Sequence, residues 1–279
     1  MRVAIIAPGE MGSGVGAQLS QRGATVTTSL LGRGAESAER AKRAGMTAID
    51  DDTALVAGAD MVLSILPPAE ALALAHRLAP ALAASGGRVL YADCNAVAPQ
   101  TVNAVAAVIA RAGAPFVDVG IIGGPPRTEG YTPRFYASGE AAAKLKPLGD
   151  FGFDIRLVEG GVGAASALKM SYASLTKGFS AIGIAAARGA AIGNVAEMLR
   201  AEFQDSQPQL FAWLQRQVPT VYPKAYRWVG EMEEIARFLG DDPGATMFEG
   251  AAQTYDVIAE RWSEKDEAGL RYLAELFRR

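Results

Sequence analysis

Short apolar runs alternate with amphipathic stretches along residues 1–160. The runs have the length of strands, and the stretches between them repeat apolar residues at helical spacing. The predicted strands are Arg2–Ala7, Thr25–Leu30, Met61–Leu66, Val89–Asp93, Pro115–Gly120 and Arg134–Ser138. The predicted helices between them include Met11–Arg22, Ala69–Ala83 and Pro99–Ala112. This alternation predicts an α/β fold, with a doubly wound sheet of parallel strands joined by crossover helices.

The strand pattern ends at Glu159-Gly160-Gly161, and the rest of the chain is compatible with helices. Four prolines punctuate this part, so that several separate helices are expected. They are Val195–Phe203, Pro208–Gln217, Tyr222–Phe238, Ala245–Trp262 and Lys265–Arg278. We therefore expect two domains, residues 1–160 with the sheet and residues 161–279 with helices alone, joined by a long interdomain helix.

The composition is that of a globular protein, with 50% hydrophobic and 20% charged residues and a mean hydropathy of +0.12 over 279 residues. The net charge of -3 gives no basic surface for nucleic acid, so no such partner is expected. The longest apolar stretch, Phe179–Ile192, is interrupted by Arg188, which predicts a protein without a membrane span. The only cysteine, Cys94, cannot form an internal disulfide, and this fits a cytoplasmic location.

A glycine-rich turn, residues 7–14, stands between the first predicted strand and the first predicted helix. Glycine lets the backbone approach a pyrophosphate, and the free amides at a helix N-terminus stabilise its charge. Although Ala7 replaces the first glycine of the usual motif, this position favours a dinucleotide site over an ordinary tight turn. Its candidate ligands are Pro8, Gly9, Glu10, Met11 and Gly12. The Glu10 carboxylate has the wrong charge for a pyrophosphate, so we expect its side chain to point away.

The end of the second strand indicates which dinucleotide binds. An NAD enzyme usually places a carboxylate there to hold the ribose hydroxyls, and none follows Ser29 in this sequence. Arg33 is available instead, and its guanidinium suits the 2'-phosphate of NADP. NADP is thus the expected cofactor of a Rossmann domain, with Ser29 and Arg33 among its ligands. The alternative is that Arg33 is a solvated loop charge.

Several segments, in consistent order, resemble the 3-hydroxyacid dehydrogenase superfamily, which includes 6-phosphogluconate dehydrogenase and 3-hydroxyisobutyrate dehydrogenase. Residues 6–12 resemble its GLGxMG loop, and residues 62–67 resemble the strand segment that ends beside the cofactor. Residues 93–99 match D-x-S-x-x-x-P, with Asn95 in the polar position. Residues 116–124 are similar to the substrate loop FVDAPVSGG, and residues 161–169 match G-x-G-x-x-x-x-x-K at the start of the interdomain helix. Residues 222–236 resemble a poorly characterised branch with a short phosphogluconate-dehydrogenase-like C-terminal domain.

The resemblance implies an NADP-dependent oxidoreductase that transfers a hydride between nicotinamide and a small polar hydroxy or carbonyl substrate. It also implies a homodimer whose helical domain serves substrate binding and dimerisation. Leu66, Pro67 and Asn95 join the expected cofactor ligands. The expected substrate residues are Ile122, Gly123, Gly124 and Thr176.

Three departures from the family pattern stand out. Ile122 occupies the position of the substrate-loop serine, and Tyr172 and Ala173 occupy those of two asparagines that follow the lysine. Residues 230–236 replace the C-terminal K-D-L-x-L-A motif and its cofactor-contacting lysine. The family's mode of carboxylate recognition is therefore not carried over to this chain.

Lys169 is the expected general acid/base, because an apolar helix favours the neutral, proton-accepting form of an amine. Tyr172 is the expected assistant, although a tyrosine that only caps a core contact is an equal alternative. Tyr172, Thr176 and Ser180 follow Lys169 at helical spacing, which predicts one polar face toward the interdomain cleft. An adjacent apolar stripe is expected to be core, and Lys177, off the Lys169 face, to be solvent-exposed. The stripe consists of Leu168, Leu175, Phe179 and Ile182.

Two other functions stay open, an imine reductase and a catalytically silent dinucleotide-binding regulator. No metal site is expected, because His76 is the only histidine and reads as a surface or half-buried side chain. Cys94 is expected to be a small buried residue rather than a nucleophile. The carboxylates of residues 50–52 are expected to cap the next helix rather than to bind calcium.

Overall fold

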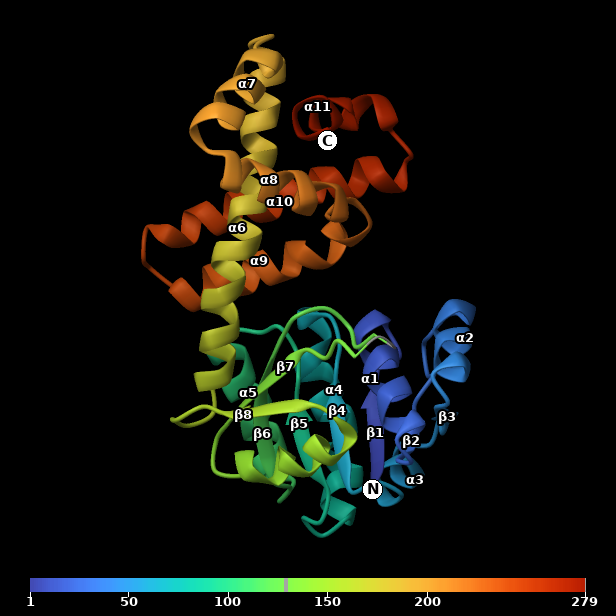
Figure 1. The fold of residues 1–279 in the computed structure, drawn as a ribbon. Coiled ribbons are helices and arrows are strands. Elements are labelled where there is room, and N and C mark those ends of the chain that lie inside the picture. The colour runs from blue at the N-terminus through green and yellow to red at the C-terminus, as the bar shows by residue number, and fades with distance from the viewer. Residues whose placement is uncertain (128–129, 279) are drawn as a thin grey trace. The chain divides into compact units, whose positions relative to one another are not determined.

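The computed structural model describes residues 1–127 and 130–278, which divide into two compact units (Figure 1). The first unit, Met1–Lys169, contains one eight-stranded sheet, and the second, Met170–Arg279, follows it along the chain. The strands of the sheet are β1 Arg2–Ile6, β2 Thr25–Thr28, β3 Thr47–Ala48, β4 Met61–Ser64, β5 Leu90–Asp93, β6 Phe116–Ile122, β7 Arg134–Ser138 and β8 Asp154–Leu157. Their order, β3-β2-β1-β4-β5-β6-β7-β8, confirms the doubly wound sheet.

The edges of the sheet differ from the prediction. The six strands from β3 to β6 are parallel, but β7 pairs antiparallel with β6, because the segment between Ile122 and Arg134 is too short for a crossover helix. The strands β3 and β8 were not predicted. Both residues of β3 are exposed, and β8 has only Ile155 partly buried, so neither edge strand carries the apolar pattern of a core strand.

Helices cover both faces of the sheet. They are α1 Glu10–Gln21, α2 Ala35–Arg43, α3 Asp52–Ala57, α4 Ala71–Ala84 and α5 Pro99–Arg111, with short 3-10 segments η1 Pro68–Glu70 and η2 Ala142–Phe151. One core cluster joins strand residues to Val15 and Leu19 of α1, Ala41 of α2 and Leu145 of η2. The other joins the opposite strand face to α3, α4 and α5. This two-sided burial explains why the central strands are almost continuously apolar.

The start of α1 lies against the end of β1 through Gly12. A Cβ atom on Gly12 would collide with the backbone oxygen of Ala7, so no larger residue fits without moving the helix. The close approach brings the N-terminus of α1 to the carboxyl edge of the sheet. Ligands of open α/β sheets bind at that edge.

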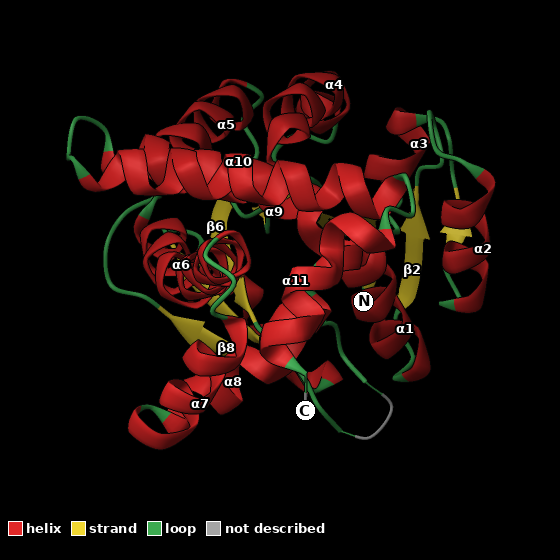
Figure 2. Cartoon of the chain, turned by 90° about the horizontal axis from the view of Figure 1, so that it is seen from above, coloured by secondary structure: helices red, strands yellow, loops and turns green. Residues whose placement is uncertain are grey.

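The second unit is built from helices, and Figure 2 shows strands in the first unit only among the described residues. The long helix α6, Ala164–Ile192, begins in the first unit and continues into the second. The other helices are α7 Ala196–Ser206, α8 Pro208–Gln217, α9 Ala225–Leu239, α10 Gly244–Ser263 and α11 Glu267–Phe277, with 3-10 segments η3 Val218–Thr220 and η4 Tyr222–Lys224. Phe211, Tyr255 and Leu273 are among its fully or almost fully buried side chains. None of the described helices is long and apolar enough to cross a bilayer.

The apolar stripe of α6 is not core, contrary to the prediction. Leu175 is 62% exposed and Ile182 55%, while Leu168 and Phe179 are 37% and 45% exposed. The helix instead buries Ala181, Ile184 and Ala187, most of them small, and Gly183 packs against Leu214 and Phe277. Helical periodicity identifies an apolar face, but it does not say which element covers that face.

Candidate functional site

The turn before α1 leaves its backbone donors available to a ligand. Gly9 is the N-cap residue, in extended conformation, and no side chain caps the helix there. The first amides of a helix that lacks a cap favour an anion, and the partial charge of the helix adds to this preference. The residues of this turn therefore fit the pyrophosphate of a dinucleotide.

Arg40 of α2 supports the same turn, and the sequence analysis did not predict this contact. Its Nε donates to the carbonyl oxygen of Pro8 at 3.1 Å, and its other nitrogens contact Glu36 and Ser37. The guanidinium therefore brings a positive charge beside the turn that precedes α1. The only sequence signal was the basic last turn of α2, which contains Arg40, Lys42 and Arg43.

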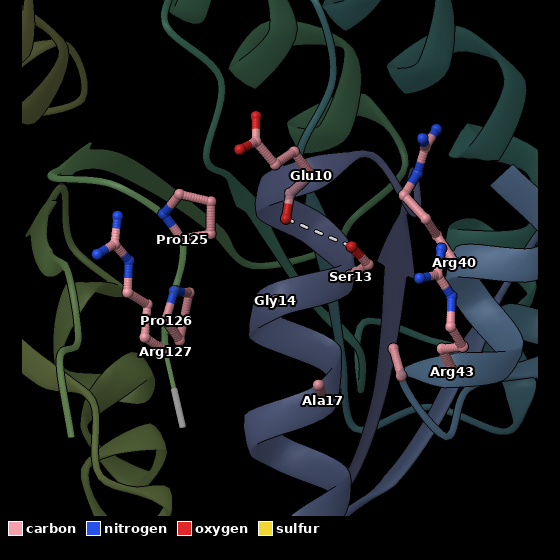
Figure 3. Close-up of a pocket in the computed structure, with 10 residues that line it drawn as sticks. Glu10, Ser13, Gly14, Ala17, Arg40, Arg43, Pro125, Pro126 and Arg127 are labelled. Carbon is pink, nitrogen blue, oxygen red and sulfur yellow. Dashed lines mark hydrogen bonds between the residues drawn. The ribbon is translucent and has the colours of Figure 1, made fainter. Parts of the chain in front are cut away.

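A cavity of about 470 Å³ lies beside α1, between α2 and residues 125–127 (Figure 3). Its lining residues are Glu10, Ser13, Gly14, Ala17, Arg40, Arg43, Ala44, Pro125, Pro126 and Arg127. Figure 3 shows the Glu10 carboxylate at the outer end of α1, with the arginines on two sides of the helix. Glu10 is exposed, so its carboxylate is able to stay in solvent.

The end of β2 carries the two residues predicted to meet the ribose end of the cofactor. Ser29 is buried, and its hydroxyl accepts from the amide of Leu31 at 3.4 Å. Arg33 forms an ion pair with Glu70 at 2.7 Å, and 26% of its side chain is exposed. A carboxylate that the sequence reasoning missed also lies here, since Asp50 accepts from the amide of Leu30 at 2.8 Å. Arg33 is thus held in place between the loop after β2 and the start of α4.

Asn95 ties the carboxyl ends of β4 and β5 together. Its side-chain oxygen accepts from the amide of Leu66 at 2.6 Å, and its side-chain nitrogen donates to Ser64 at 2.8 Å. Its backbone amide donates to Asp93 at 3.0 Å. Asn95 is only 3% exposed, and its buried side chain holds the Leu66-Pro67 turn in place through these hydrogen bonds.

Asp93 is fully buried at the end of β5. Burial and, to a smaller extent, the neighbouring Asp118 raise its pKa to about 7, although the hydrogen bonds from Asn95 lower it. Its second oxygen has no hydrogen-bond partner in the part of the chain that the structure describes. Burial likewise raises the pKa of the Cys94 thiol, which confirms Cys94 as a buried residue without the character of a nucleophile.

The predicted substrate loop follows β6. The Ile122 side chain is buried and offers no polar group. The amide of Gly124 donates to the hydroxyl of Tyr131 at 3.2 Å, and Tyr131 is 45% exposed. This hydroxyl was not predicted, because Tyr131 lies outside the motif of the substrate loop. A backbone hydrogen bond, in which the amide of Arg127 donates to the carbonyl oxygen of Tyr131, helps to hold Tyr131 near the loop.

Lys169 lies in the second turn of α6, over β6. A Cβ atom on Gly120 would be 3.1 Å from the Cβ of Lys169, so strand and helix are in close contact there. The ammonium of Lys169 makes no hydrogen bond or ion pair with the residues that the structure describes. Gly120 stands two positions before Ile122, so Lys169 is close to the predicted substrate loop.

The polar face predicted beyond Lys169 is only partly correct. Tyr172 is 49% exposed, and the hydroxyl of Thr176 donates to the Tyr172 carbonyl at 3.2 Å. Ser180, however, is 1% exposed and donates to the Thr176 carbonyl. The accessible polar face therefore ends before Ser180.

Lys177 was expected in solvent, and this is wrong. Its side chain is 13% exposed, its ammonium pairs with Glu231 of α9, and it lies 4.9 Å from the ring centre of Trp228. The buried Tyr255 donates to the Lys177 carbonyl. Helical spacing places Lys177 off the Lys169 face, but it gives no information on α9, which supplies these partners.

Other predictions concern residues outside this site. His76 is exposed on α4, and Asp51 caps α3 by accepting from the amide of Ala54 at 2.6 Å, both as predicted. Among residues 1–127 and 130–278, no three metal-ligating side chains come together.

Known proteins resemble this chain in sequence and in fold. Residues 2–148, just over half of the chain, match the sequence profile of the NAD binding domain of 6-phosphogluconate dehydrogenase. The chain belongs to this family. Residues 190–258, in the second unit, match a domain of unknown function, DUF1932. The match to the 6-phosphogluconate dehydrogenase family therefore lies in the first unit.

Two proteins illustrate how far the similarity extends. An uncharacterized 28.5 kDa protein of Methanothermus fervidus is 32% identical over 182 residues, which cover 65% of this chain and 68% of its own. A conserved protein of unknown function, described as structurally similar to 3-hydroxyacid dehydrogenases, superposes with a TM-score of 0.68 at 27% identity. That superposition covers 93% of this chain and 97% of the other.

More distant structures share the fold alone. A 3-hydroxyisobutyrate dehydrogenase of Mycobacterium tuberculosis has a TM-score of 0.62 at 19% identity, covering 99% of this chain and 97% of its own. An imine reductase of Myxococcus stipitatus in complex with NADP+ has a TM-score of 0.53 at 17% identity, covering 96% and 95%. The family match identifies an NAD(P)-dependent oxidoreductase, and the structure at 27% identity has the 3-hydroxyacid dehydrogenase fold.

Asp93 makes the stability of this family member dependent on pH. Its pKa is about 7 in the folded protein, against about 3.9 in an unfolded chain. Between these values the folded state holds a proton that the unfolded state releases. The free energy of unfolding should therefore fall as the pH rises from 4 to 7, by on the order of 4 kcal/mol, and level off above that.

Urea titrations at a series of pH values measure this dependence. Asp93→Asn should remove most of the fall, whereas Asp150→Asn, at an exposed carboxyl of η2, should retain it. Equal slopes for the wild type and Asp93→Asn between pH 4 and 7 would contradict the assignment.

Proposed function

We propose that the protein is an NADP-dependent oxidoreductase that interconverts a hydroxyl and a carbonyl group on a small polar substrate. The observation that carries the proposal is the position of Lys169, over β6 beside the predicted substrate loop and without a described partner for its ammonium. A proton donor or acceptor at this place complements a nucleotide held at the carboxyl edge of the same sheet.

The residues proposed to bind the nucleotide favour a dinucleotide with a 2'-phosphate. The uncapped N-terminus of α1 suits a pyrophosphate, and Arg33 stands at the end of β2, where NAD enzymes usually have a carboxylate. The Arg33 guanidinium would change its partner from Glu70 to the 2'-phosphate or bind both, because a fork of five donors serves two anions. Pro8 to Gly12, Ser29, Leu66, Pro67 and Asn95 complete the proposed cofactor site.

Replacing Arg33 tests this choice of cofactor. Arg33→Ala should raise the Kd for NADPH about 10-fold or more and change the Kd for NADH less than twofold, because only NADPH carries the 2'-phosphate. Protein fluorescence during titration with each nucleotide measures both constants. Arg156→Ala, at an exposed arginine of β8, is the control. A similar loss for both nucleotides would count against the proposed phosphate contact.

Lys169 would move the proton while the cofactor handles the hydride. A bound nicotinamide supplies or accepts a hydride at its C4 atom, and the substrate oxygen must gain or lose a proton in the same reaction. We assign this proton to the Nζ atom of Lys169. Tyr172 and Thr176, three and seven positions on along α6, would orient the substrate oxygen and line the pocket.

The Tyr131 hydroxyl is a further candidate for substrate binding. The Gly123-Gly124 backbone has no serine hydroxyl beside it, since Ile122 is buried, but Tyr131 brings a half-exposed hydroxyl to Gly124. A hydroxyl there is able to donate to a substrate carboxylate or carbonyl. The contact also favours a polar substrate over an apolar one.

The proton role predicts the effect of removing Lys169. Lys169→Met should lower kcat by about 10²- to 10⁴-fold and leave the Kd for NADPH within twofold, because the amine acts on substrate rather than nucleotide. The matched control is Lys146→Met, at an exposed lysine of η2. Turnover is followed by NADPH absorbance on a panel of 3-hydroxyacids, the corresponding aldehydes and cyclic imines.

The panel also separates the alternatives. Turnover of imines alone would favour an imine reductase, and tight NADPH binding without any turnover would favour a silent regulator. Normal turnover by Lys169→Met would refute the proton role.

We further propose that the protein is a homodimer that pairs through α6. Leu168, Leu175 and Ile182 recur every seven residues on this helix and remain exposed, and the stripe itself contains no charged residue. A second copy of the same stripe is a complementary partner, because seven-residue repeats pack against one another. Burial of the stripe would also remove a large apolar surface from water.

Light scattering tests the dimer. Leu175→Glu should convert it to a monomer, because an unpaired carboxylate would be buried in the interface. Met247→Glu on α10 is the control, since Met247 is 63% exposed and lies outside the stripe. A monomeric wild type, or a Leu175→Glu variant that remains a dimer, would contradict this interface.

A further inference from the structure

A row of buried polar side chains crosses four neighbouring strands of the sheet. Ser64 of β4 pairs in register with Asp93 of β5, Asp93 with Asp118 of β6, and Asp118 with Ser138 of β7. None of the four is more than 1% exposed. Buried polar groups are costly unless hydrogen-bonded, so a row of this kind needs a reason in the structure.

Asp118 shows what the row holds. One of its carboxylate oxygens accepts from the amides of Gly163 and Ser166, at 2.9 and 3.1 Å, and from the Ser138 hydroxyl at 3.0 Å. The other accepts from the Ser166 hydroxyl at 2.7 Å. The Ser138 hydroxyl in turn accepts from the amide of Ala165 at 3.0 Å. Three backbone amides at the N-terminus of α6 are thereby bound to side chains of the sheet.

This contact is a helix cap supplied from another element. The carboxylate satisfies the donors that the first turn of α6 leaves open, and its negative charge lies at the positive end of the helix dipole. The two ordinary side-chain caps of the described structure, Asp51 of α3 and Asp266 of α11, come from the residue just before their own helix. Asp118, in contrast, fixes α6 to β6 across 45 positions of sequence.

Two residues after Asp118, at Gly120 of β6, the strand also packs closely against α6. A Cβ atom on Gly120 would lie 2.7 Å from the carbonyl oxygen of Ala165 and 3.1 Å from the Cβ of Lys169. The strand therefore touches the backbone of α6 and the base of the Lys169 side chain. With hydrogen bonds at Gly163, Ala165 and Ser166 and contact at Lys169, the first turns of α6 have little freedom to move on the sheet.

We infer that Asp118 is a positioning residue, which holds the start of α6 so that the Lys169 amine stands at a fixed place over the carboxyl edge of the sheet. The inference rests on the proposed role of Lys169 in proton transfer. Proton transfer requires heavy atoms within hydrogen-bond reach, and a displacement of about 1 Å is enough to cost 10²-fold in rate. A helix held by a buried carboxylate meets this requirement better than one held by apolar contacts alone, because hydrogen bonds have direction.

Asp118→Asn tests the carboxylate with almost no change in shape. An amide nitrogen cannot accept, so the variant loses at least one of the four hydrogen bonds and the negative charge. We expect kcat to fall about 10- to 100-fold, with KM and the Kd for NADPH within twofold. Asp51→Asn removes a helix-capping carboxylate of the same unit, at α3, and should leave all three constants unchanged.

A second measurement needs no substrate. Trinitrobenzenesulfonate labels accessible lysine amines, and peptide mass spectrometry gives the labelling rate of Lys169 relative to the exposed Lys146 of the same molecule. In Asp118→Asn this ratio should change at least about threefold, because the amine is no longer held in one environment. In Asp51→Asn it should be that of the wild type.

If Asp118→Asn does not fold, as judged by circular dichroism, the variants Ser166→Ala and Ser138→Ala test the positioning role instead. Ser166→Ala removes one hydroxyl from the carboxylate, and Ser138→Ala removes the bridge to Ala165, while both keep the charge. Each should lower kcat by at least about threefold and shift the labelling ratio in the same direction.

The outcomes separate this inference from the proposed function. Loss of turnover in Lys169→Met, combined with unchanged kcat and labelling in a folded Asp118→Asn or in both serine variants, overturns the positioning role alone. Normal turnover in Lys169→Met overturns the proton role and with it the catalytic meaning of the position. A fall in kcat with an altered labelling ratio in Asp118→Asn, and neither in Asp51→Asn, supports the inference.

Discussion

The carboxylate of Asp118 at the start of α6 is the interaction on which the arrangement of the first unit depends. A carboxylate with no exposed surface would be strongly destabilising alone, and here four hydrogen bonds and the helix dipole stabilise it. The same contact fixes where α6 leaves the sheet. Because Lys169 follows within the next turn, the sheet and the helix together determine the place of the candidate amine.

A second constraint acts at the other end of the candidate site. The packing of α1 on β1 requires glycine at position 12, and it brings uncapped amides to the carboxyl edge of the sheet. Asn95 and Arg40 then hold the neighbouring loops by hydrogen bonds to backbone atoms of Leu66 and Pro8. The proposed nucleotide site therefore consists mainly of backbone groups, and side chains hold that backbone in place. This explains why a short glycine motif was informative although Ala7 departs from it.

The sequence predicted best those elements that are determined by their own residues. Strands such as β1 and β4 are buried on both faces, so their apolar runs were unambiguous, whereas β3 and β8 exist because a neighbouring strand offers a free edge. For the same reason the stripe of Leu175 and Ile182 was read as core. Its period is a property of α6, but its burial depends on partners that one helix does not encode.

The candidate site follows the same rule. The Gly9 turn and Lys169 belong to motifs of fixed spacing and Arg33 follows a predicted strand, so the sequence makes each of them a candidate. Arg40, Asp50 and Tyr131 come near these residues through tertiary contacts, which the sequence does not predict. Asp118 lies within a recognised motif, yet its role came only from the register of β5, β6 and β7. Local spacing identifies which residues to examine, and the strand order shows which of them meet.

The pair of Lys177 and Glu231 has a consequence for mutations in this chain. Both side chains are mostly shielded from solvent, and the Lys177 ammonium also lies over the Trp228 ring. The ion pair therefore lowers the cost of burying each charge. A single mutation at either position would remove the ion-pair partner of a charge that is mostly shielded from water, and this is destabilising. The effects of mutations at the two positions are therefore expected to be coupled, so that a change at one position alters which residues are tolerated at the other.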